Sequence, residues 1–207
     1  LNLRAGGRAF QAAAYGEALE FYSAAAKLLI PETRAQQSEL AYALDLGKIR
    51  SLYLSGETIF AIKLIEQQLS SETSLAKRLE LLQLCSVIQT NVPDIEAASD
   101  TILRALGHCD VEIFSSPKEY SQASERVAAS DLLPSSIEGI AKLVNIPKCV
   151  DPDQLAQIEL CAYAYIPLMQ AQKRQMCDYV SCQAALKSIE FGASASTPLA
   201  LSCFGTY

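Results

Sequence analysis

Apolar residues recur along this chain at intervals of three and four, with polar residues between them. In residues 38–54 they roughly follow the 3.6-residue period of an α-helix. The same period predicts further helices at 1–14, 15–30, 57–69, 74–89, 95–106, 118–129, 135–143, 151–170, 172–191 and 198–204. No segment alternates as a half-buried strand does, and 110–114 is at most a short extended link. The pattern therefore predicts an all-α protein that is more than about 60% helical.

Three of these helices begin with one shared rhythm. A short turn comes first, then a small residue, then a large apolar residue four positions later. The small residues are Ala18, Ala61 and Ala98. This pattern is typical of the second helix of a tetratricopeptide-type hairpin, in which the alanine lets a neighbouring helix approach. Such hairpins stack into a solenoid because one alone cannot bury its apolar face.

The repeat is not regular. The matching alanines are 43 and 37 residues apart, and both spacings exceed the roughly 34 residues of a regular tetratricopeptide. We expect an irregular solenoid with three hairpins in 1–107, a connector with short helices in 108–150, and a further hairpin plus the start of a truncated helix in 151–207. The missing initiator methionine and the abrupt end suggest a piece of a longer protein.

Several single residues predict where helices meet or end. Gly6 is a small residue at the expected crossing of the first two helices, and Pro31 is expected to stop the second. Ser135 and Glu138 have the spacing of a capping box. Asp151, followed by proline, is a good N-cap for the helix that begins there.

The charge balance restricts the possible partners. A net charge of −6 and a pI near 4.9 leave no broad basic surface, so nucleic acid and anionic membranes are poor partners. The longest apolar runs are far too short to cross a bilayer, and no signal peptide is visible. We therefore expect a cytoplasmic protein whose partner is another protein or another domain of the same chain.

Motifs for catalysis or metal binding are missing from the sequence. There is no phosphate-binding loop and no Cys-x-x-Cys, and the single histidine, His108, is expected as a solvated residue at a helix end. The seven cysteines predict buried free thiols, with a redox-active exposed pair as the alternative. We expect no cofactor, no metal and no enzymatic activity in this segment.

The first helix of each hairpin should line the groove of the solenoid. The expected groove positions lack the lysines and asparagines that hold an acidic peptide end in many tetratricopeptide proteins. The polar or aromatic candidates on this face are Arg50, Tyr53, Glu80 and Gln83. Tyrosine and arginine often dominate interface energies, so these four residues are the predicted binding positions.

Four stretches of the chain resemble a known family. They are the opening Leu-Asn-Leu-Arg-Ala-Gly-Gly-Arg-Ala, the following 13–21, and the later 146–152 and 179–194. These stretches are similar to the helical-repeat region of large hybrid sensor histidine kinases of fungi and of related bacterial multidomain kinases. The resemblance implies an interaction or regulatory module that acts in a phosphorelay. It also implies that the phosphorylated histidine, the ATP-binding boxes and the receiver aspartate lie elsewhere in the parent protein.

Other functions stay open at this point. Similar solenoids sense an inducer or partner in ATPase-regulated transcription factors, and a passive spacer between catalytic domains would have the same helices. An enzyme with an unrecognised site is the alternative from a different class.

Overall fold

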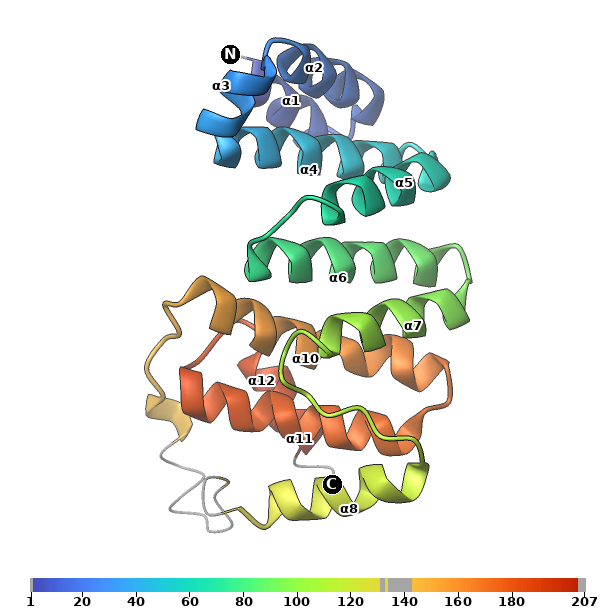
Figure 1. Cartoon of the computed structure of the whole chain (residues 1–207), viewed down its shortest axis with the longest axis vertical. Helices are drawn as coiled ribbons and strands as arrows, with labels where there is room; N and C mark the ends of the chain where they lie inside the picture. The colour runs from blue at the N-terminus through green and yellow to red at the C-terminus, as the bar shows by residue number, and fades with distance from the viewer. Residues whose placement is uncertain (1, 131–132, 134–142, 205–207) are drawn as a thin grey trace. The chain divides into compact units, whose positions relative to one another are not determined.

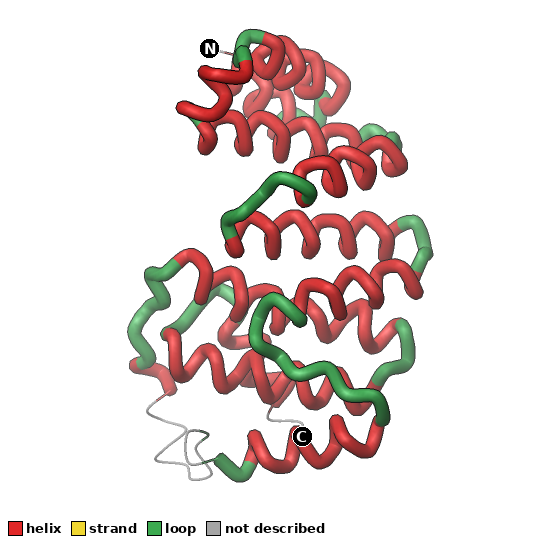
Figure 2. Tube along the Cα trace, in the orientation of Figure 1, coloured by secondary structure: helices red, strands yellow, loops and turns green. Residues whose placement is uncertain are grey.

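The computed structural model describes residues 2–130, 133 and 143–204, and that part of the chain is all-α (Figures 1 and 2). That described part is 76% helical, above the predicted threshold. In the described residues the sole extended pairing is an isolated bridge between Lys148 and Ala193. The helices are α1 (Asn2–Gln11), α2 (Tyr15–Lys27), α3 (Pro31–Gln36), α4 (Ser38–Leu54), α5 (Thr58–Leu69), α6 (Leu75–Asn91), α7 (Ile95–Leu106), α8 (Pro117–Ala128), α10 (Pro152–Gln170), α11 (Arg174–Phe191), α12 (Thr197–Phe204) and the 3-10 turn η1 (Leu143–Asn145).

The chain divides into two compact units, Leu1–Ser71 and Glu72–Tyr207. The division falls inside the stretch 1–107 that the sequence grouped as three hairpins. The first two predicted hairpins lie in unit 1, and the third lies in unit 2. The reason is tertiary, because α6 and α7 both pack against α10 from the C-terminal part of the chain.

Unit 1 is built from two helical pairs. Helices α1 and α2 pack against each other, α4 packs against α5, and α2 joins the pairs by packing against α4. Its core contains Ala18, Tyr22 and Leu44. The Tyr22 ring lies between two glycines, Gly6 of α1 and Gly47 of α4, which confirms Gly6 as a crossing point. A Cβ added at either glycine would lie 2.7 Å from a ring carbon.

Unit 2 is centred on α10 and α11. Helix α10 packs against α6, α7 and α11, while α8 and α12 pack against α11. Ala98 of α7 is fully buried, as are Ala18 of α2 and Ala61 of α5 in unit 1, so all three alanines of the predicted rhythm are buried. Cys85, Ile102 and Leu168 are also fully buried in unit 2.

Helix ends follow local chemistry. The Asp151 carboxylate accepts hydrogen bonds from the backbone N–H groups of residues 153 and 154, at 3.0 and 2.9 Å, which confirms it as the N-cap of α10. Gly192 follows α11 at φ +112°, a conformation that favours glycine, and an added Cβ would lie 2.7 Å from the Cys149 nitrogen. Both predicted helix limits are correct to within a residue or two.

Two local predictions have different outcomes. Helix α2 ends at Lys27, and Pro31 instead begins the short helix α3, because proline is well suited to the first helical position. The predicted capping box at 135–138 lies outside the described residues. A capping box is found instead at Ser116 and Glu119, at the start of α8, with Ser116 Oγ accepting from the Glu119 N–H.

Candidate functional site

The four predicted groove residues lie as two pairs on two helices. Arg50 and Tyr53 are three residues apart on α4 of unit 1, and Glu80 and Gln83 are three residues apart on α6 of unit 2. Members of each pair are therefore neighbours on one helix face. Because the pairs belong to different units, each pair is a separate candidate surface. Arg50 is exposed and the other three are half-buried.

Arg50 also acts on the core of unit 1. Burial raises the pKa of Tyr22, and the positive charge of Arg50 partly offsets that rise by favouring the phenolate. The guanidinium therefore lies close enough to the buried ring to influence its ionisation.

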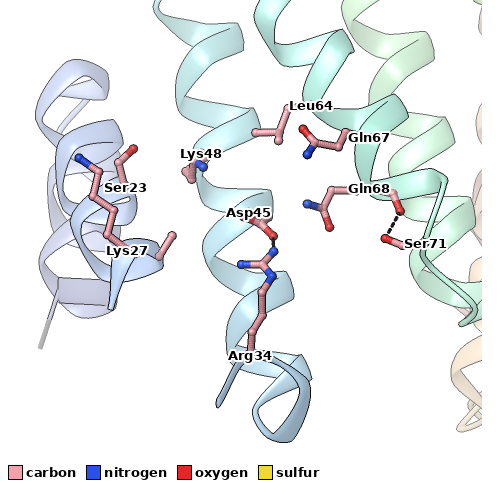
Figure 3. Close-up of a pocket in the computed structure, with 10 residues that line it drawn as sticks. Ser23, Lys27, Arg34, Asp45, Lys48, Leu64, Gln67, Gln68 and Ser71 are labelled. Carbon is pink, nitrogen blue, oxygen red and sulfur yellow. Dashed lines mark hydrogen bonds and ion pairs between the residues drawn. The ribbon is translucent and has the colours of Figure 1, made fainter. Parts of the chain in front are cut away.

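A polar cleft in unit 1 is a candidate site (Figure 3). It has a volume of about 750 Å³ and none of the four predicted groove residues lines it. The lining residues come from α2, α3, α4, α5 and the turn that follows α5. They are Ser23, Ala26, Lys27, Arg34, Asp45, Lys48, Leu64, Gln67, Gln68 and Ser71.

Helical spacing explains why these residues meet. Lys27 lies one turn after Ser23 on α2, and Lys48 lies one turn after Asp45 on α4. On α5 and its end, positions 64, 67, 68 and 71 form one continuous face. Three helices thus turn polar faces towards one space, and α3 brings Arg34 to its edge (Figure 3).

The cleft is held at one side by an ion pair. The Arg34 guanidinium donates to the Asp45 carboxylate, and Asp45 is only 3% exposed. A carboxylate this buried needs a charged or hydrogen-bonding partner to offset the loss of its hydration, and Arg34 supplies it. The pair therefore anchors the short helix α3 to α4, as the direct packing of these helices also indicates.

The remaining charges of the cleft are positive. Lys27 is exposed and Lys48 is half-buried. Among the residues that the structure describes, neither lysine forms an ion pair. With Arg34 largely neutralised by Asp45, the two ammonium groups give the cleft a local positive charge in a chain whose net charge is −6. This charge favours an anionic ligand.

Sequence reasoning overlooked this site although part of its signal was present. The spacings 23–27, 45–48 and 67–68–71 each mark a polar helix face. The predicted groove lay on the first helices of the hairpins alone. The cleft also draws on α2 and α5, the second helices, together with a short helix that the periodicity did not reveal.

The cysteines are free, and six of the seven are buried. This confirms buried thiols as the ordinary state of these residues, with Cys203 half-buried. Burial raises the pKa of Cys177 to about 12 and that of Cys182 to about 11. The pKa of Cys109 is raised by a hydrogen bond with Cys161 and by burial. These thiols are protonated at neutral pH and are poor nucleophiles there.

Metal-binding and membrane-spanning features were sought in the same residues. Within the described ranges, no group of three or more His, Cys, Asp or Glu side chains is arranged to hold a metal ion. His108 lies exposed just beyond the end of α7. None of the helices in the described part of the chain has both the length and the apolar content needed to cross a membrane.

No family model, curated protein or solved structure matches this chain. The class that the structure defines is therefore an all-α protein of two helical units, one of which contains a cationic polar cleft.

Proposed function

We propose that this chain is a non-catalytic interaction module of the tetratricopeptide-like type, and that the polar cleft of unit 1 binds an acidic peptide segment. The observation that carries the proposal is the pair of lysines, Lys27 and Lys48, beside the neutralised Arg34–Asp45 pair. Helical hairpins with an alanine at the crossing, such as those containing Ala18 and Ala61, support the repeat assignment.

An acidic peptide suits this cleft for two physical reasons. Carboxylates pair with ammonium groups through charge-assisted hydrogen bonds, which are stronger than neutral ones. The amide and hydroxyl groups of Gln67, Gln68 and Ser23 can donate to and accept from a peptide backbone. The cleft is thus equipped for an extended segment with side-chain carboxylates.

The test compares two double variants of equal charge. K27Q/K48Q removes both cleft ammonium groups, while R4Q/K63Q removes two exposed cations of the same unit that do not line the cleft. The probes are short fluorescein-labelled peptides rich in Asp and Glu, and their Asn and Gln counterparts. Binding is measured by fluorescence anisotropy at several salt concentrations.

We expect K27Q/K48Q to weaken binding of the acidic probe by about 5–30-fold, corresponding to about 1–2 kcal/mol. R4Q/K63Q should bind nearly as the wild type does, and the neutral peptides should bind weakly to all three proteins. Equal affinities of the two double variants, or a preference for the neutral probe, would overturn the assignment of the cleft.

The predicted groove surface on α4 gives a competing location. The variant R50A/Y53A should leave acidic-peptide binding within about threefold of wild type if the cleft is the site. If R50A/Y53A loses binding while K27Q/K48Q keeps it, the interaction surface lies on the α4 groove face instead. Glu80 and Gln83 on α6 are tested in the same way as the second candidate surface.

The placement of this module in a cytoplasmic sensor histidine kinase rests on the sequence resemblance. In that setting the module would bind a signalling partner or another domain of the same chain in a phosphorelay. Reading the full-length gene on both sides of this segment tests it: a histidine kinase core supports the placement, and a DNA-binding domain favours the transcription-factor alternative. A phosphoryl-transfer assay on this chain alone tests the non-catalytic assignment.

A further inference from the structure

A second pocket lies within unit 2 and differs in chemistry from the polar cleft. It has a volume of about 350 Å³ and is formed by the end of α7, the loop that follows, and the starts of α8 and α11. Its principal lining residues are Leu103, Phe114, Tyr120, Gln172, Lys173 and Met176. Small-molecule sites are commonly of this size, mostly apolar with a few placed polar groups.

The apolar wall is held in place by a cluster of aromatic rings. Phe114 makes edge contacts with Tyr120 and Tyr179, with ring centroids 5.1 and 5.5 Å apart. The Tyr120 hydroxyl oxygen accepts a hydrogen bond of 3.0 Å from the Phe114 N–H, which fixes the loop against α8. The pocket is therefore preformed, and a ligand need not order it.

Two side chains of the pocket, Lys173 and Tyr120, have N–H or O–H groups without an acceptor among the described residues. Lys173 Nζ donates to the buried Ser99 Oγ at 2.7 Å, and an ammonium group has three N–H bonds. Tyr120 is 5% exposed, and its hydroxyl accepts but finds no acceptor for its own proton among the described residues. Lys173 has no carboxylate partner there either.

Glu119, the residue before Tyr120, is an exposed acid whose carboxylate is bound by the loop before α8. Its carboxylate accepts four hydrogen bonds from the backbone and hydroxyl groups of Ser115 and Ser116, at 2.8–3.2 Å. These bonds lower the pKa of Glu119, so it stays ionised within its own capping box. Among the described residues that line the pocket, Lys173 is the one with a charged side chain, so its ammonium is the charge that would meet a ligand.

We propose that this pocket binds a small monocarboxylic acid with an aromatic or aliphatic body. The body would lie against Leu103, Phe114 and Met176, and the carboxylate would accept from Lys173. The volume corresponds to roughly a dozen water molecules, which limits the ligand to about ten non-hydrogen atoms. This site lies in the other unit from the polar cleft, and its assignment is independent of peptide binding.

The chain has two methionines, and this makes the test direct. Met176 lines the pocket, whereas Met169 is exposed near the end of α10 and does not line it. Protein labelled with ¹³C at the methionine methyl groups therefore gives one reporter signal and one internal control, assigned with M169L. The probes are 3-phenylpropanoate and its neutral isostere 3-phenylpropanamide.

We expect 3-phenylpropanoate to shift the Met176 signal saturably while the Met169 signal stays unchanged, and 3-phenylpropanamide to bind at least about tenfold more weakly. K173Q should weaken binding of the acid by a similar factor, and K148Q, which removes an exposed cation outside the pocket, should not. An unmoved Met176 signal at millimolar acid, equal binding of acid and amide, or full binding by folded K173Q would overturn the proposal. The comparison of acid with amide uses the wild-type chain, so it holds even if K173Q fails to fold.

Discussion

The packing of Tyr22 between Gly6 and Gly47 gives a sharp prediction for the variant Gly47→Ala. The added Cβ would lie 2.7–2.9 Å from three carbon atoms of the Tyr22 ring, where real Cβ contacts essentially never occur. The ring has little room to retreat, because Gly6 on the opposite helix permits the same close approach, also at 2.7 Å. The helices α1 and α4 must therefore shift relative to α2.

The expected magnitude combines two opposing effects. Overpacking of a well-packed core costs about 1–3 kcal/mol. Replacing glycine by alanine inside a helix gains about 1 kcal/mol from helix propensity. Gly47→Ala should therefore lower the free energy of unfolding by about 0–2 kcal/mol, although alanine is the better helix former.

Gly16→Ala is the matched control. Gly16 also lies in a helix of unit 1, and a Cβ there would meet no atom within 4 Å. It gains the propensity term, up to about 1 kcal/mol, without the clash. The difference between the two variants should therefore be about 1–3 kcal/mol, measured by urea unfolding followed by far-ultraviolet circular dichroism.

A double-mutant cycle identifies the ring as the cause. Tyr22→Leu alone should destabilise, but Gly47→Ala placed in the Tyr22→Leu background should cost less than it does in the wild type, with a coupling energy of about 1 kcal/mol or more. If Gly47→Ala stabilises the protein as much as Gly16→Ala does, the Tyr22 ring of α2 does not pack closely on Gly47 of α4.

Two further predictions concern the core. Ala61→Leu and Ala98→Leu should each lower the free energy of unfolding by about 1–3 kcal/mol through overpacking. The control Ala24→Leu, at an exposed position, should change it by less than about 0.5 kcal/mol. Unchanged melting temperatures for both buried variants would contradict the predicted helix crossings. Stability should also fall as the pH rises from 9 towards 12. Folding raises the pKa of Cys182 from 9.0 to about 11 and that of Cys177 to about 12, so the folded state keeps thiol protons that the unfolded chain has lost. The urea midpoint, measured under reductant, should be lower near pH 10 than at pH 8, and a constant or rising midpoint would refute this.

The positions of the helices were largely predictable, because the signals are local. The predicted helix 38–54 is found as Ser38–Leu54, and 95–106 as Ile95–Leu106. Apolar periodicity and capping residues such as Asp151 act over three or four positions, which is the range of helical hydrogen bonding. Helix α3 was missed, since its six residues are too few to show a period.

The candidate site was not predictable to the same degree. Arg50, Tyr53, Glu80 and Gln83 were chosen by helix face, but whether two faces form one surface depends on the packing of separate helices. The Ser116 capping box is a local feature by contrast, and its Ser-x-x-Glu spacing could have been predicted directly from the sequence.

What the sequence by itself determined is the all-α class, the bounds of the long helices and the small residues at their crossings. Each of these follows from backbone hydrogen bonding and from side-chain size within a few residues. Only the tertiary structure decided that α6 and α7 pack with α10, so that the chain divides at Ser71. It alone also decided that Arg34 neutralises Asp45 and leaves Lys27 and Lys48 in a cleft. Those arrangements depend on burial of apolar area between helices far apart in the sequence, which no local pattern encodes.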